Sequence, residues 1–182
     1  MIVFDEVQQC PKARQAIKYL VADGRYDYIE TGRPMSLSRD DSRFKIYLAD
    51  TGLFITLCFW NKDFTDTIIY QKLLTDKLQT NLGYIYENLV AQMLVAAGHK
   101  LFYYTWAKDE KHNYEIDFLL SRKNKLCPIE VKSSGYSAHV SLDAFAKKFS
   151  SRIDTPYLIY TKDLRQDASV VLLPAYLTQL LK

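Results

Sequence analysis

The residues best suited to chemistry lie in one stretch of the chain, residues 113–132, in which polar and apolar side chains alternate on both sides of a polar tetrad. A period of two predicts a half-buried strand on each side. The tetrad, residues 122–125, predicts the turn of an antiparallel hairpin centred between Lys123 and Asn124. In that register, facing residue numbers have a constant sum, so the register fixes which charged side chains meet.

Four charged side chains are predicted to share one face of this hairpin. Asp117 faces Glu130, and Glu115 faces Lys132. Two carboxylates opposite each other destabilise a ladder unless a positive charge lies between them. A divalent cation would supply that charge, and so would the ammonium of Lys132. Carboxylate oxygens suit Mg²⁺ or Mn²⁺, which keep several waters and leave room for a phosphate, so the pattern points to phosphodiester chemistry.

An Asp on one strand followed by Glu-x-Lys on the next resembles the PD-(D/E)xK motif of restriction-endonuclease-like nucleases. Under this hypothesis Asp117 and Glu130 hold the metal ion, and Lys132 orients the water and stabilises charge on the phosphate. The alternative interpretation is a solvated face that carries an ordinary Glu-Lys pair. The hairpin residues alone leave both interpretations open.

A further acid, Glu87, lies on a predicted helix that Asn81 caps and that ends near Ala97, before Gly98. Helical spacing predicts a buried stripe with Glu87 at its edge. The stripe consists of Leu82, Ile85, Tyr86, Leu89, Met93 and Ala96. Glu87 either extends its carboxylate to water or faces the metal site, where it would add a carboxylate or position Lys132.

Two acids end the first apolar run of the chain, Met1-Ile2-Val3-Phe4-Asp5-Glu6. The run, a predicted helix over 11–21 and a predicted strand over 26–32 resemble the second half of an AAA-type ATPase domain, from the Walker B strand to the sensor strand. The resemblance gives Asp5 and Glu6 the Walker B role in nucleotide and Mg²⁺ binding. No Gly-x-x-x-x-Gly-Lys-[Ser/Thr] loop occurs in the sequence, so we expect that this chain does not hydrolyse ATP.

From residue 44 onward the pattern predicts a strand, two helices, three strands, a helix and a strand, followed by a strand over 170–173 and a terminal helix that Pro174 opens. Asp50 is placed to cap the first of these helices. Part of this order is the αβββαβ core of restriction-endonuclease-like folds, an α/β fold with a mixed sheet flanked by helices. The segment resembles the uncharacterised domain that follows the ATPase module in a large prokaryotic family of AAA-type ATP-binding proteins. Four blocks carry that resemblance: 44–52, 86–90, 114–118 and 128–132.

Two regions are therefore predicted. Residues 1–43 form a remnant of an ATPase domain and residues 44–182 form the restriction-endonuclease-like domain. The remnant lacks its neighbouring strands, so Ile2, Val3 and Phe4 need another apolar surface, either on the main domain or on a second chain. Self-association through the remnant is one expected interaction.

Composition argues against a strongly basic nucleic-acid-binding protein and against a membrane-spanning one. The chain has 182 residues and a net charge of +3, so any contact with nucleic acid would be local. Basic residues gather around 122–125 and 147–152. The three cysteines are isolated and suit a reducing cytoplasm. The longest apolar run, 53–60, is too short to span a bilayer.

Two functions remain open. The first is a Mg²⁺- or Mn²⁺-dependent nuclease that uses Asp117, Glu130, Lys132 and Glu87. The second is a non-catalytic module of the same fold that binds nucleic acid or a protein and is normally coupled to an ATPase. ATP binding through Asp5 and Glu6 alone is a third and weaker interpretation.

Overall fold

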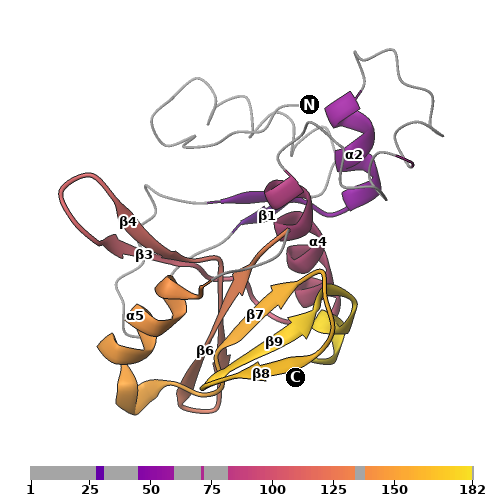
Figure 1. The fold of residues 1–182 in the computed structure, drawn as a ribbon. Helices are drawn as coiled ribbons and strands as arrows, with labels where there is room; N and C mark the ends of the chain where they lie inside the picture. Colours follow the sequence, from indigo (N-terminus) through magenta and orange to yellow (C-terminus); the bar gives the residue numbers. More distant parts are fainter. Residues whose placement is uncertain (1–27, 31–44, 60–70, 72–81, 134–137, 182) are drawn as a thin grey trace.

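The protein is built around a five-stranded mixed sheet, seen in the computed structural model of the chain (Figure 1). The structure describes residues 28–30, 45–59, 71, 82–133 and 138–181. In spatial order the strands are β5 (Phe118–Arg122), β6 (Lys125–Val131), β7 (Tyr157–Tyr160), β9 (Val170–Pro174) and β8 (Arg165–Asp167). The inner pairs β6–β7 and β7–β9 are parallel and the outer pairs are antiparallel. The predicted α/β class, with a mixed sheet flanked by helices, is confirmed.

Two smaller antiparallel pairs and several helices complete the described fold. The pairs are β1 (Tyr28–Glu30) with β2 (Ile46–Leu48), and β3 (Tyr104–Ala107) with β4 (Asn113–Ile116). The α-helices are α2 (Thr51–Phe59), α4 (Leu82–Ala96) and α5 (Val140–Lys148), and the 3₁₀ helices are η2 (Ser150–Arg152) and η3 (Ala175–Leu180). The β3–β4 hairpin projects away from the large sheet (Figure 1).

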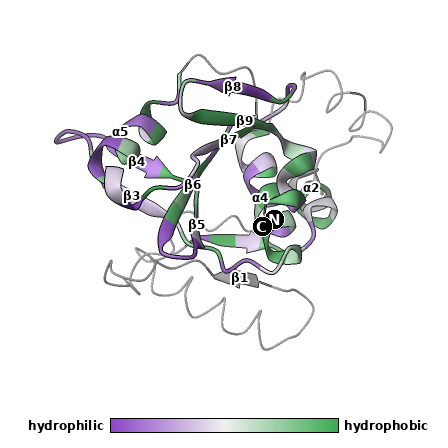
Figure 2. Cartoon of the chain, turned by 90° about the horizontal axis from the view of Figure 1, so that it is seen from below, coloured by the Kyte–Doolittle hydropathy of each residue, from purple (hydrophilic) through white to green (hydrophobic). Residues whose placement is uncertain are grey.

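Helices cover both faces of the large sheet, so its inner strands β6, β7 and β9 are buried on both sides. Figure 2 shows α4 and α5 on opposite sides of β6 and β7. One core cluster joins α4 to the side chains of Phe118, Leu120 and Ile129. The other joins α5 to Leu119 and Leu158. Consecutive residues of β5 thus enter different cores, as the two-residue period of a strand requires.

The predicted hairpin forms, but its first strand is divided in two. The register is as predicted, with Phe118 opposite Ile129 and Arg122 opposite Lys125. At Asp117 the chain bends, and the residues before it form β4 and pair with β3 instead. Glu115 consequently lies opposite Thr105, and the prediction that it faces Lys132 is wrong. The turn leaves Lys123 in the left-handed region, with φ of 54°.

The predicted helix over 82–97 forms as α4, but its buried face differs from the predicted stripe. The buried residues are Ile85, Asn88, Val90, Ala91 and Leu94. Only Ile85 belongs to the predicted set, because α4 carries apolar residues around most of its circumference and periodicity alone does not select one face. Gly98 ends the helix as predicted, with φ of 88°, a conformation that glycine adopts without strain.

Residues 45–59 form a strand and a helix, as predicted. The Asp50 side chain accepts a hydrogen bond from the Leu53 amide at 2.8 Å, which is the expected N-terminal cap of α2. β2 pairs with β1, so a strand from the predicted ATPase remnant is joined to the predicted main domain. The domain boundary at 43/44 stays a prediction. The first strand of that remnant, including Asp5 and Glu6, lies outside the described residues.

The C-terminal part contains one strand that the sequence did not predict. β8 is polar and forms a hairpin with β9 through Ala168, whose φ is 50°. The strand predicted after the last helix of the core forms as β7, the predicted strand over 170–173 forms as β9, and the predicted terminal helix forms as η3. Within the part of the chain that the structure describes, no helix is both long enough and apolar enough to cross a membrane.

Candidate functional site

One lysine lies among three carboxylates at the junction of α4, β2 and β4. The Nζ atom of Lys45 is 2.8 Å from Glu87 Oε1 and 3.6 Å from Asp117 Oδ1, and it also forms an ion pair with Glu115. The hydroxyl of Tyr47 donates a second hydrogen bond to the same Glu87 oxygen. We call these five residues the Lys45 cluster.

Hydrogen bonds to α4 fix β2, the strand that Lys45 directly precedes. The Asn88 side chain accepts from the Leu48 amide at 2.8 Å and donates to the Leu48 carbonyl at 3.0 Å, so it completes the edge of β2. It also donates to Thr51 Oγ1, and Gln92 accepts from the amide and hydroxyl of Thr51. Lys45 directly precedes β2 and lies two positions before Tyr47, and both side chains donate to Glu87 Oε1.

Asp117 is held at the bend between β4 and β5. Its Oδ2 atom accepts a hydrogen bond from the Val131 amide at 2.8 Å. The residue therefore does not continue the ladder, which ends at Phe118 and Ile129, and it is not a ladder partner of Glu130. The bend turns the carboxylate towards Lys45 and towards the end of β6.

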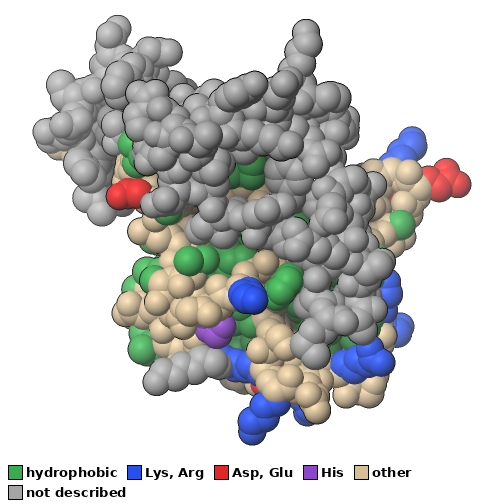
Figure 3. All heavy atoms as spheres, turned by 180° about the vertical axis from the view of Figure 1, so that it is seen from behind, with side chains coloured by type: hydrophobic (Ala, Val, Ile, Leu, Met, Phe, Trp, Pro, Cys, Tyr) green, Lys and Arg blue, Asp and Glu red, His purple; other side chains and the backbone are tan. Residues whose placement is uncertain are grey.

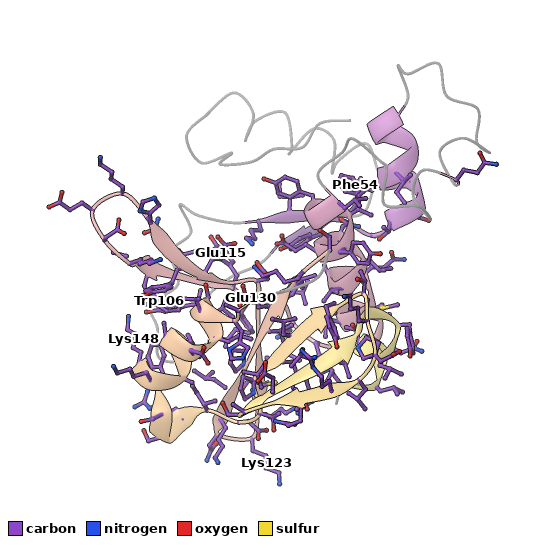
Figure 4. All side chains as sticks on the ribbon, in the orientation of Figure 1. Phe54, Trp106, Glu115, Lys123, Glu130 and Lys148 are labelled. Atoms are coloured by element: carbon purple, nitrogen blue, oxygen red, sulfur yellow. The ribbon has the colours of Figure 1, made fainter. Side chains whose placement is uncertain are left out.

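The end of β6 carries a second ion pair. Lys132 Nζ lies 2.7 Å from Glu130 Oε1, and the side chain of Glu130 is only 8% exposed. The other oxygen, Glu130 Oε2, is buried and has no hydrogen-bond partner among the described residues. We call Glu130 and Lys132 the β6 pair. Figure 4 shows Glu115 and Glu130 in the same region, near the base of the β3–β4 hairpin.

Burial and charge shift the pKa values of this region strongly. Burial raises the pKa of Asp117 to about 7, against the attraction of Lys45, and the charges of Glu87 and Glu115 add to the rise. Burial acts to lower the pKa of Lys45, but Asp117, Glu87 and Glu115 raise it well above its ordinary value. Burial also opposes the charge on Lys132, whose pKa is nevertheless raised, chiefly by Glu130 and then by Asp117 and Glu115. Lys132 thus couples the β6 pair to the Lys45 cluster.

The structure brings together most of the residues singled out in the sequence. Glu87 and Asp117 meet at Lys45, and Glu130 meets Lys132. Glu87 does not extend into open water, because it lies in line with the buried residues Val90 and Leu94 and its side chain is 16% exposed.

Sequence reasoning missed Lys45 and Tyr47. Their two-residue spacing on a predicted strand was visible, but nothing local indicated that this strand would pack against α4. Lys45 and Glu87 are 42 positions apart in the chain.

The excess of negative charge in this region suits a divalent metal ion, although the described residues supply few ligands for one. Four carboxylates face two ammonium groups, and one buried carboxylate oxygen has no partner. Mg²⁺ is commonly held by one or two carboxylates and several waters, which Asp117 and Glu130 could provide. The described residues contain no group of three or more His, Cys, Asp or Glu side chains placed to hold a metal.

The predicted basic clusters lie apart from this acidic region. Figure 4 shows Lys123 at the far end of the β5–β6 hairpin from Glu130. Lys148 Nζ donates to Tyr104 Oη at 3.2 Å and lies over the rings of Tyr104 and Trp106. On the face seen in Figure 3, Lys and Arg side chains gather along the lower part of the described surface.

The fold and this site define an α/β protein with a partly buried carboxylate-lysine centre at one end of its mixed sheet. The family described as Domain of unknown function (DUF4143) matches residues 82–177, more than half of the chain, and the chain belongs to that family. No curated protein and no solved structure matches it.

Proposed function

We propose that this protein is a restriction-endonuclease-like, metal-dependent hydrolase of nucleic-acid phosphodiester bonds. One observation carries the proposal: the buried Glu130, with a carboxylate oxygen left without a partner, lies beside Lys132 in a region where carboxylates outnumber ammonium groups. A buried carboxylate oxygen without a partner lowers the stability of the folded protein unless a cation binds to it. The resemblance of Asp117, Glu130 and Lys132 to the PD-(D/E)xK pattern supports the same conclusion.

Each residue has a defined role in this proposal. Asp117 and Glu130 would hold Mg²⁺ or Mn²⁺, and the bound ion would lower the pKa of a water and so supply hydroxide near neutral pH. Lys132 orients the water and stabilises negative charge on the phosphate. Glu87 acts through Lys45, whose ammonium it holds at 2.8 Å, and so helps to position Asp117.

The direct test measures cleavage of single- and double-stranded DNA and RNA with Mg²⁺ or Mn²⁺. We expect Asp117→Ala and Lys132→Ala to lower the cleavage rate at least about 100-fold, the scale of losing a general acid-base or electrostatic group. Asp109→Ala and Lys111→Ala, in the exposed β3–β4 loop, are the matched controls and should cleave at the parent rate. Equal rates for the site variants and the parent would refute the assignment.

A second candidate function is a non-catalytic module of the same fold that binds nucleic acid or a protein. The observation that favours it is the ammonium of Lys45, which already forms ion pairs with three carboxylates. The discriminating measurement is the thermal midpoint with and without Mn²⁺. An ion that binds only the folded state raises the midpoint by mass action, whereas no shift favours the binding module.

The proposal also includes the relation to ATPases. Residues 1–43 would be the remnant of an AAA-type domain, with Asp5 and Glu6 as a Walker B pair that lacks its phosphate-binding loop. Nucleotide titration should therefore give no binding by this chain. The buried thiol of Cys127 is free, which agrees with the proposed reducing, cytoplasmic setting.

A further inference from the structure

The position of Lys45 bears on how many metal ions the proposed site can take. Three carboxylates from three parts of the fold converge on its ammonium: Glu87 from α4, Glu115 from β4 and Asp117 from the bend. An ammonium is a compact charge with three donors, so three carboxylates match it in number. The site thus contains a cation that belongs to the chain itself.

We propose that Lys45 is a positioning residue that stands where a second metal ion would otherwise bind, so that the site takes one divalent ion and not two. The inference rests on the proposed function, because it concerns the same carboxylates. It deepens that function by stating the metal stoichiometry and the residue that sets it.

The surroundings of Lys45 argue that its ammonium is a fixed part of the site. Asn88 holds β2 against α4 through hydrogen bonds to both backbone groups of Leu48, which follows Lys45 by three residues. Tyr47, on the same face, shares Glu87 with Lys45. The side chain of Lys45 is 23% exposed, so it is not a freely moving surface lysine.

The ligand supply argues for a single ion. A two-metal site places its ions about 3.5–4 Å apart and needs carboxylates for both. Glu87 and Glu115 form the close ion pairs with Lys45. This leaves for a metal Asp117, whose distance to Lys45 is longer at 3.6 Å, and the Oε2 atom of Glu130, which has no hydrogen-bond partner among the described residues. Two carboxylates with several waters suffice for one Mg²⁺ or Mn²⁺.

The test replaces the ammonium and counts bound ions. Mn²⁺ is titrated into the full chain and followed by electron paramagnetic resonance and calorimetry, together with the thermal midpoint in EDTA. We expect one equivalent for the parent and one more for Lys45→Met. In EDTA, Lys45→Met should melt several degrees below the parent, and Mn²⁺ should restore most of the loss. Lys45→Arg, which keeps the charge, should bind as many ions as the parent, and so should Lys100→Met, which removes an exposed lysine.

The outcomes separate this inference from the proposed function. If the parent binds one ion and Lys45→Met gains none, the inference is overturned and the metal-dependent function stands. If the parent binds none and Lys45→Met binds one, Lys45 does occupy a cation site, but the proposed metal-dependent function fails. If Lys45→Met does not fold in EDTA, the double variant Lys45→Met/Glu115→Gln is used instead. It removes one of the three carboxylates that lose their ammonium partner in Lys45→Met. It must still gain an ion relative to Glu115→Gln, and equal counts for these two variants overturn the inference.

Discussion

At Asp117, burial and the nearby carboxylates oppose ionisation, while the ammonium of Lys45 and the amide of Val131 favour it. The first group of effects prevails, because the pKa rises from an ordinary 3.8 to about 7. The folded protein therefore binds this proton more tightly than the unfolded chain does. By linkage, Asp117 lowers stability progressively as the pH rises from about 4 to about 7, and the full cost is present above that range.

Asp117→Asn should consequently stabilise the metal-free protein in a pH-dependent way. The amide resembles the protonated acid and can still accept from the Val131 amide. In EDTA, we expect the stability difference between variant and parent to widen in favour of the variant by about 2 kcal/mol between pH 5 and pH 8. Urea unfolding at several pH values measures it. Glu110→Gln, at an exposed position, is the control, and a difference for Asp117→Asn that stays constant with pH would contradict the raised pKa.

The hydroxyl of Tyr47 is the second donor to Glu87, and its ring packs against Phe118 with centroids 5.5 Å apart. Tyr47→Phe keeps the ring and removes only the donor. Because hydrogen bonds to charged groups contribute more than neutral ones, we expect a loss of about 1–2 kcal/mol in the free energy of unfolding. Denaturant unfolding tests this. Tyr176→Phe, at a residue that is 65% exposed, should change stability by less than about 0.5 kcal/mol.

At the scale of elements, the contact between β2 and α4 matters most for the site. Asn88 is 3% exposed and forms hydrogen bonds to both backbone groups of Leu48. A side chain on a helix thus makes the hydrogen bonds that a neighbouring strand would otherwise make. This contact joins the segment that carries Lys45 to the helix that carries Glu87.

Asn88→Ala should therefore loosen β2. It leaves the part-buried backbone groups of Leu48 without this partner, and we expect a loss of about 2–3 kcal/mol in stability. Hydrogen exchange should show faster exchange of the Leu48 amide, while amides in β7 change less. Asn113→Ala removes an exposed asparagine from β4 and is the matched control. Unchanged protection at Leu48 in Asn88→Ala would show that other contacts hold β2.

The division of the predicted strand at Asp117 is the other decisive feature at this scale. A continuous strand would have carried Glu115 along the edge of the large sheet towards Lys132. The bend instead pairs β4 with β3, which brings Glu115 to Lys45. The Asp117 side chain itself bonds to the Val131 amide across the bend, so one residue both shapes the turn and joins the site.

The whole molecule has two cores, one on each face of the sheet, and Phe145 is central to the second. It is fully buried and packs against Tyr104, Trp106 and Phe149, so it ties α5 to the β3–β4 hairpin. Phe145→Ala should lower stability by about 3–5 kcal/mol, because it leaves a cavity. Thermal unfolding and near-ultraviolet circular dichroism measure the effect. Leu164→Ala, at a residue that is 60% exposed, should be nearly neutral.

Most of the predicted elements that fall within the described residues, and for which neighbours along the chain supplied the signal, are present in the structure. Alternation and a polar tetrad were enough to predict the register of β5 and β6. Asp50 and Gly98 marked helix ends through capping and backbone conformation, effects that act within a few residues. The polar strand β8 was missed, because an edge strand of the sequence Arg-Gln-Asp carries no apolar alternation.

The sequence by itself determined the three described α-helices, most of the described strands, the hairpin register and the presence of an Asp, Glu and Lys near one end of β6. Only the tertiary structure decided which face of α4 is buried, where the hairpin strand bends, and that Lys45 lies among Glu87, Glu115 and Asp117. The physical reason is that local periodicity records the environment of each side chain and not the identity of its partner. Partners so far apart in the chain are chosen by how the helices and strands pack together.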